Sequence, residues 1–302
     1  MGVAAMISQI AAAAALLSAQ TAATIAPPVE PSAVLRPSSD WYVDYGEDYC
    51  RLARQFGKDE HKSVFYLEAY EPSSAFSLVV AGPDFSPLPR QSVTVHFGPG
   101  GLERTSEGAP KIVMGEFQDG VMLNHTPLFE PPKLDPKAPP SPDTSPTIDP
   151  AKAKSIEWLD VSRGKKPPVR LALGQMGGPI EALNACTDEL LTHWGIDLAA
   201  HRNRATAPKP IGNPGEWISS DDYPSGLSDA GSQGIVFFRL AVDANGKVTS
   251  CHIQRNTGSD AFEHAICDLF AKRARFKPAL DKQGNPMASY WRSEVRFVAG
   301  WG

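Results

Sequence analysis

The sequence has no run of basic residues, no Cys-x-x-Cys pair and no Gly-x-Ser-x-Gly motif. Its net charge is −5, so binding of nucleic acid through neutralisation of the phosphates is not expected. The seven histidines are scattered, which argues against a zinc site, and the usual nucleophile elbow of a hydrolase is absent. These absences favour a binding protein. We expect no enzymatic activity, no cofactor, no metal and no small-molecule substrate.

The sequence also lacks charge over its first 29 residues. An alanine-rich apolar stretch from Ile10 to Leu17 is followed by small residues up to Ala23, which is typical of a secretory signal peptide at 1–23. The basic residues that usually begin such a peptide are missing, so an uncleaved membrane anchor is the alternative. Polar residues interrupt the apolar stretch, however, and a stable span usually needs about 20 strongly apolar residues. We therefore expect an exported protein.

Cysteine is scarce, but its four copies divide evenly along the chain. Cys50 and Cys186 precede the last third of the sequence, whereas Cys251 and Cys267 lie within it. In an exported protein this even count predicts one disulfide in each part, Cys50–Cys186 and Cys251–Cys267. The second bridge would close a short loop and add about 3 kcal/mol to the free energy of unfolding. Four buried free thiols are the alternative.

Proline is abundant, with 28 copies, and its distribution helps to divide the chain. A loose segment at 24–39 is predicted as a linker, and a segment rich in Pro, Asp, Lys and Ser at 130–150 as an extended loop. Residues 201–214 show little apolar periodicity and are predicted as an inter-domain linker. The chain should therefore hold one domain at 40–200 and a second at 215–302.

The first of these domains consists of short runs with strand-like composition, mostly separated by Gly, Pro or Ser. Trp41, Val43 and Tyr45 alternate with polar residues, as in a half-buried strand. One helix is predicted from Gly178 to Trp194, where apolar residues recur at helical spacing. The pattern predicts a mainly antiparallel β domain with one helix. The further candidate strands are Ser63–Tyr70, Phe76–Ala81, Gln91–Phe97, Lys111–Phe117, Val121–Leu123 and Val169–Leu173.

The C-terminal unit follows a strand, strand, helix, strand pattern, which makes the overall fold class α+β. Asn245-Gly246 favours a tight hairpin turn between the first two strands. Asp260 and Glu263 have the spacing of a capping box at the start of an amphipathic helix. The strands are expected at Gly234–Asp243, Val248–Gln254 and Ser289–Val298, with the helix after Ser259.

Short motifs in this unit occur in a characteristic order: Tyr223-Pro224, Gly234, the hairpin from Val242-Asp243 to Gly246-Lys247-Val248, Gly258-Ser259, Arg275-Phe276 with Pro278-Ala279, and Gly284 with Pro286. In order and spacing they resemble the C-terminal domain of TonB-type energy transducers. The resemblance covers about residues 215–300. The sequence departs from the family at Ala274, where a tryptophan is common, and at Ser220, where well-known transducers have a partner-contacting glutamine.

The resemblance implies a domain that binds a protein partner by strand addition. The last strand, at about 289–297, would present an exposed edge whose N–H and C=O groups pair with the main chain of the partner. The side chains of Tyr290, Trp291, Arg292 and Arg296 would add selectivity. The alternatives are that this edge pairs with the first domain or with a second copy in a homodimer.

We therefore expect an exported periplasmic adaptor that binds segments of outer-membrane transporters or other envelope proteins, in TonB-dependent transport. An uncleaved N-terminus would instead make the protein an energy transducer anchored in the inner membrane, because coupling to the proton-driven motor needs that helix. A third alternative is an enzyme or ligand-binding module in the first domain, which a polar pocket with two or more histidines would favour.

Overall fold

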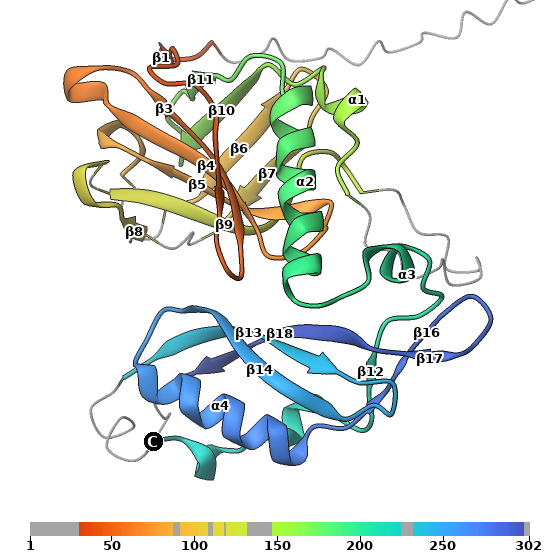
Figure 1. The fold of residues 1–302 in the computed structure, drawn as a ribbon. Coiled ribbons are helices and arrows are strands. Elements are labelled where there is room, and N and C mark those ends of the chain that lie inside the picture. The colour runs from red at the N-terminus through yellow and green to blue at the C-terminus, as the bar shows by residue number, and fades with distance from the viewer. Residues whose placement is uncertain are drawn as a thin grey trace, which may run out of the picture.

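The chain folds into an upstream domain of two sheets and a C-terminal domain of one main sheet and a helix (Figure 1). The α+β fold class is thereby confirmed. The predicted signal peptide or anchor at 1–23 and most of the predicted loop at 130–150 lie outside the described residues. The computed structural model describes residues 30–86, 91–107, 111–117, 119–131, 147–224 and 232–298.

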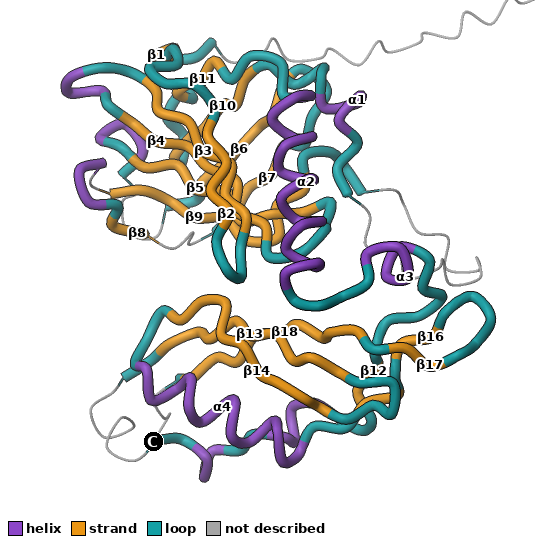
Figure 2. The backbone as a smooth tube through the Cα atoms, in the orientation of Figure 1, coloured by secondary structure: helices purple, strands orange, loops and turns teal. Residues whose placement is uncertain are grey.

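The described strands of the upstream domain form two sheets (Figure 2). Nearly all neighbouring strands in them are antiparallel. The exception is the parallel pairing of β1 with β11. The six-stranded sheet has the order β2 (Tyr42–Tyr45), β3 (Cys50–Phe56), β4 (Ser63–Ala69), β5 (Ala75–Ala81), β9 (Asp119–Pro127) and β8 (Lys111–Val113). The five-stranded sheet has the order β1 (Ala33–Leu35), β11 (Val169–Ala172), β10 (Trp158–Arg163), β6 (Val93–Gly98) and β7 (Glu103–Ser106).

The two upstream sheets share one apolar core. Because side chains alternate along a strand, every second residue points inward, and Phe65 of β4 and Leu159 of β10 are fully buried in the same cluster. The helix α2 (Gly177–His193) stands beside both sheets and adds Ile180 and Leu190 to this cluster. Short helical segments join the strands, namely η1 (Asp59–His61), η2 (Pro83–Phe85), η3 (Gly115–Phe117) and α1 (Pro150–Ala153).

Some upstream segments differ from the sequence-based expectation. The strand predicted at Lys111–Phe117 ends at Val113, because Gly115 adopts a φ of +51° and begins η3. The predicted linker at 24–39 contains β1. Besides β1, the strands β3, β7 and β10 have no range among the predicted ones. Polar residues at alternate positions hide an apolar pattern as short as that of Leu159 and Val161 in β10.

The main sheet of the C-terminal domain has the order β14 (Val248–Asn256), β13 (Gly234–Val242) and β18 (Ser289–Phe297), with all neighbours antiparallel. The helix α4 (Asp260–Arg273) covers one face of this sheet, on the side away from the upstream domain (Figure 1). Gly246, in the β13–β14 turn, has a φ of +79°, and a Cβ there would lie 1.9 Å from the carbonyl oxygen of Phe276. Only glycine fits this turn. The core between sheet and helix contains Val236, Phe238, Leu240, Val242, Phe262, Ile266 and Phe270.

The region predicted as an inter-domain linker at 201–214 contains short structured elements. The end of α3 (Leu198–Arg202) lies within it, and β12 (Lys209–Pro210) pairs with β15 (Phe276–Lys277) of the C-terminal domain. The chain then forms the turns η4 (Pro214–Trp217) and η5 (Ser220–Asp222). A further small hairpin consists of β16 (Ala279–Leu280) and β17 (Pro286–Met287).

Candidate binding edge of the C-terminal sheet

The strand β18 lies at an edge of the C-terminal sheet. It pairs with β13 along its whole length, from Ser289 opposite Val242 to Phe297 opposite Gly234. No other strand in the described part of the chain pairs with β18, so its outer side presents main-chain N–H and C=O groups. The strand β14 forms the opposite edge. The predicted open edge of the last strand is therefore present in the structure.

A surface pocket of about 290 Å³ lies along the C-terminal half of β18. One wall comes from the strand, at 295–298, and the other from the segment 218–223 that leads into the domain. Ser219 and Ser220 line this pocket. The pocket therefore brings a polar segment beside the open edge.

The segment 218–223 is fixed to the domain core by an aromatic ring and an ion pair. The ring of Tyr223 contacts Phe262 and Phe297 with centroid distances of 5.6 and 5.5 Å. Arg273, at the end of α4, donates two hydrogen bonds of 2.6 and 2.9 Å to the carboxylate of Asp222. These bonds from Arg273, with those from Ser219, hold the pKa of Asp222 well below its usual value. Arg273 thus holds the segment 218–223 against the end of α4.

Two of the four residues predicted to add selectivity have side chains packed inside the protein. Tyr290 is buried, and its ring stacks on His201 and meets Trp194 edge to face. Trp291 packs against the apolar core of the C-terminal domain, with its ring 5.7 Å from that of Trp217.

The two arginines of this set differ in exposure. Arg292 points to the upstream domain, where it donates a hydrogen bond of 2.6 Å to Glu71. Arg296 has 68% of its side chain exposed and pairs with Glu294 on the same strand. Of the four residues, Arg296 thus has the side chain most accessible from solvent. The role of all four in partner binding stays a prediction.

The face of the C-terminal sheet opposite α4 carries polar side chains that contact the upstream domain. Arg239 of β13 has 4% of its side chain exposed, lies 3.9 Å from the ring centre of Trp194, and donates a hydrogen bond of 3.2 Å to Asp48. Burial lowers the pKa of the Arg239 guanidinium, whereas Asp48 raises it. Gln254 of β14 donates to the main-chain oxygens of Asp48 and Tyr70. Local sequence patterns carry no signal for these contacts, because each contact joins residues about 200 positions apart.

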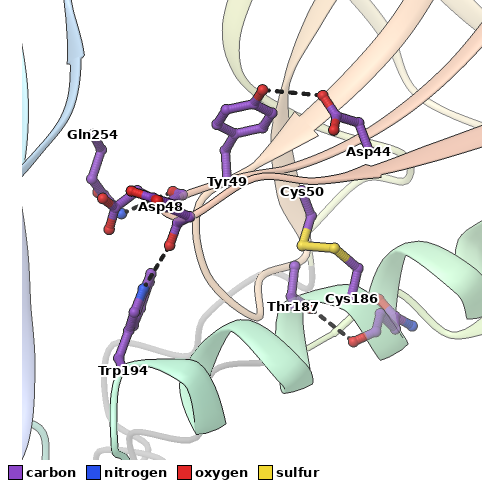
Figure 3. The surroundings of a disulfide bond; sticks show 10 residues. Asp44, Asp48, Tyr49, Cys50, Cys186, Thr187, Trp194 and Gln254 are labelled. Carbon is purple, nitrogen blue, oxygen red and sulfur yellow. Dashed lines mark hydrogen bonds between the residues drawn. A yellow bond between two sulfur atoms is a disulfide. The ribbon is translucent and has the colours of Figure 1, made fainter.

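Both predicted cysteine pairs are bonded. Cys50 of β3 is joined to Cys186 of α2, with 6.0 Å between the Cα atoms (Figure 3). Figure 3 also shows Asp48, two residues before Cys50, between Gln254 of the C-terminal domain and Trp194 at the end of α2. The first disulfide is therefore close to the inter-domain contact. The second joins Cys251 of β14 to Cys267 of α4 across a Cα separation of 5.4 Å.

A three-stranded antiparallel sheet with one helix on one face and an open edge strand defines a small α+β domain. Residues 220–299 match the family of the Gram-negative bacterial TonB protein C-terminal, so this part of the chain is a TonB C-terminal domain, as the motifs predicted. Such domains generally interact with outer-membrane proteins, which is consistent with a TonB-like role in the cell envelope and with a protein as partner. No curated protein matches the chain.

Two further observations concern the described residues alone. No helix among them is both long and apolar enough to cross a bilayer. They also contain no group of three or more His, Cys, Asp or Glu side chains placed to hold a metal ion.

Proposed function

We propose that the protein is an exported periplasmic adaptor that binds an extended segment of an outer-membrane transporter or another envelope protein as a fourth strand beside β18. The observation that carries this proposal is the open edge of β18 with a pocket along it. The main chain of β18 would supply affinity, and the pocket at Ser219 and Ser220 would accept a side chain of the bound strand. In this proposal the protein acts by binding and has no catalytic activity.

The expected affinity is modest. Each main-chain hydrogen bond contributes on the order of 1 kcal/mol net, and ordering a flexible peptide costs about 2–5 kcal/mol. A segment with about six such bonds would therefore gain at most about 4 kcal/mol from main-chain pairing, which corresponds to binding in the millimolar range or more weakly. Weak, reversible binding is suited to a component that has to release its partner.

The inter-domain contacts support this use of the edge. Arg239 and Arg292 reach the upstream domain from the flat face of the sheet, and their ion pairs with Asp48 and Glu71 do not involve the outer main-chain groups of β18. The upstream domain would thus support the sheet from behind while the partner pairs at the side. If the N-terminal segment remained uncleaved, the same edge would serve an anchored energy transducer.

Main-chain pairing can be tested with N-methylated peptides. A ten-residue peptide from the N-terminal segment of a transporter would be titrated into the full-length protein and followed by calorimetry. Two derivatives would carry N-methyl groups on alternate residues, one on the odd positions and one on the even positions. In an added strand only every second N–H faces β18, so one derivative should lose binding and the other should retain it. Equal binding by all three peptides would exclude strand addition.

The position of the bound strand can be tested with two matched tyrosine substitutions. Ser220→Tyr fills the pocket beside β18, whereas Thr249→Tyr places the same bulk on the exposed edge strand β14. We expect Ser220→Tyr to weaken binding about tenfold and Thr249→Tyr to leave it unchanged. The opposite result would move the proposed site to β14.

The export part of the proposal has its own measurement. The intact mass of the protein from the host envelope, taken without reductant, should lack the residues up to about Ala23 and four hydrogens. A full-length mass would favour the anchored transducer instead.

A further inference from the structure

The outer face of the five-stranded upstream sheet bears a second candidate site, which is separate from the edge of β18. In β10, Leu159 and Val161 point into the core, so Trp158, Asp160 and Ser162 point to the opposite face. This face encloses a hollow of about 560 Å³, a size within the range of small-ligand pockets. Its lining includes Thr94, His96, Trp158, Asp160, Lys165 and Arg170.

The base of this hollow is an aromatic ring held by its neighbours. Trp158 lies across Gly98 of β6, where a Cβ would come within 2.1 Å of the indole. The guanidinium of Arg170 lies 3.9 Å from the ring centre, and the ring of His96 approaches at 5.0 Å, nearly perpendicular. Trp158 therefore has a fixed orientation and remains partly exposed.

Planar polar groups surround this ring. Arg170 donates two hydrogen bonds of 2.7 Å to the carboxylate of Asp160, one from Nε and one from Nη2. The next positions across the sheet are His96 and Glu103, whose side chains are 3.7 Å apart. Acceptors and donors thus alternate in a row across four strands, an arrangement able to bind neighbouring hydroxyl groups of one ligand.

Two free cations complete the hollow. Lys165 and Lys166 are exposed in the turn that follows β10, and within the described parts of the chain neither ammonium group has a carboxylate within 4.0 Å. With Arg170 they give the hollow three cationic groups against the carboxylates of Asp160 and Glu103. The carboxylates of Asp160 and Glu30 offset the charge of Arg170, so the preference for an anionic ligand rests on Lys165 and Lys166.

We propose that this hollow binds a saccharide that carries a carboxylate. The sugar ring would lie along the exposed edge of Trp158, since Arg170 covers the face of that ring. Its hydroxyls would bind the row formed by Asp160 and His96, and its carboxylate would face Lys165 and Lys166. An extended acidic peptide fits less well, because the hollow is lined by side chains on the face of a sheet and not by the unpaired main-chain groups of a strand edge. The described lining contains one histidine, and the proposal is for binding without chemical conversion.

Two sugars that differ in one carboxylate provide the test. N-acetylmuramic acid and N-acetylglucosamine share the ring and the acetamido group, but only the first carries a lactyl carboxylate. Their binding to the full-length protein would be compared by saturation-transfer NMR and calorimetry at low salt. We expect the acidic sugar to bind about tenfold more tightly, since each exposed lysine contributes roughly a factor of three. Absence of binding by either sugar, or equal binding by both, would overturn the proposal.

Matched variants locate the binding. The double variant Lys165→Ala with Lys166→Ala should lose the preference for the acidic sugar. The double variant Lys58→Ala with Lys272→Ala removes the same charge from exposed positions outside the hollow and should keep the preference.

Two competitors identify the chemistry that is recognised. Lactate at equal concentration should not displace the acidic sugar, and displacement would show that the hollow recognises an anion only. Tighter binding of a tetraglutamate peptide than of the acidic sugar would overturn the saccharide in favour of a peptide. Both competition experiments use the full-length protein and leave the edge of β18 unchanged.

Discussion

In each domain a disulfide joins a helix to a sheet, but the two domains differ in what covers the other face of that sheet. Cys186 joins α2 to the upstream sheet, and Cys267 joins α4 to the C-terminal sheet. Upstream, a second sheet completes an apolar core of its own. In the C-terminal domain the second face is polar, and Arg239, Gln254 and Arg292 bind the neighbouring domain there.

This difference separates two physical roles. Burial of apolar side chains supplies most of the stability of a domain. Partly exposed ion pairs add little to that stability, and here they mainly fix the orientation of one domain relative to the other. The C-terminal sheet uses its apolar face for its own core and its polar face to fix its position on the upstream domain. The edge strand β18 is left as the side available to a partner.

The two disulfides should differ in how much they stabilise the protein. Cys50–Cys186 spans 136 residues and Cys251–Cys267 spans 16. Because constraint of the unfolded chain grows with loop length, the double serine variants should lose about 5 and about 3 kcal/mol respectively. Urea denaturation followed at both domains measures the two losses. A larger loss for the shorter loop would show that native-state effects outweigh the loop-length effect.

The two faces of β13 can be compared with adjacent phenylalanines. Phe238 is 1% exposed between sheet and helix, whereas Phe237 is half-buried at the inter-domain pocket. Phe238→Ala should cost about 4 kcal/mol, and Phe237→Ala about 1–2 kcal/mol, because only the first leaves a cavity in the core. Thermal and urea unfolding check both values. Equal losses would mean that the inter-domain face is as tightly packed as the core.

The elements that form the apolar core of the C-terminal domain could be predicted well from the sequence. Alternation in β13, the Asn245-Gly246 turn and the helical stripe of α4 are local patterns, and the structure has these elements within a few residues of the predicted bounds. Family motifs predicted the open edge at β18, which is an edge strand. Local periodicity thus carries most of the information about which residues face a core.

The polar contacts between the two domains could not be predicted in the same way. Arginines such as Arg239 and Arg292 are typical of the solvated face of a sheet. Only the arrangement of the two domains places Asp48 and Glu71 within hydrogen-bonding distance of them. For the same reason Trp158 gave no signal of a site, since its partners His96 and Arg170 come from two other strands. Contacts between distant parts of a chain depend on topology, which single-sequence patterns do not determine.

The ion pair between the domains should have a moderate effect. Asp48→Ala leaves the buried guanidinium of Arg239 without its carboxylate, and because Asp48 is itself 21% exposed we expect a loss of about 2 kcal/mol. Glu116→Ala is the control, since its pair with Lys62 is well exposed and should contribute less than about 0.5 kcal/mol. A double-mutant cycle with Arg239→Met isolates the coupling. A coupling energy near zero would mean that the pair does not link the domains.

The ion pair of the segment beside β18 should have the smallest effect, visible as a pH dependence. The pKa of Asp222 is depressed in the folded protein, so its pair with Arg273 stabilises the fold above the unfolded pKa of about 4. That contribution should disappear as the pH falls below about 4 toward the folded pKa. Wild type and Asp222→Asn should therefore differ in unfolding midpoint at pH 7, and this difference should shrink steadily as the pH falls from about 4 to about 2, whereas Asp221→Asn should follow the wild type throughout. A constant difference down to pH 2 would show that Asp222 acts through packing rather than through its charge, and the pocket beside β18 would then be maintained without the ion pair.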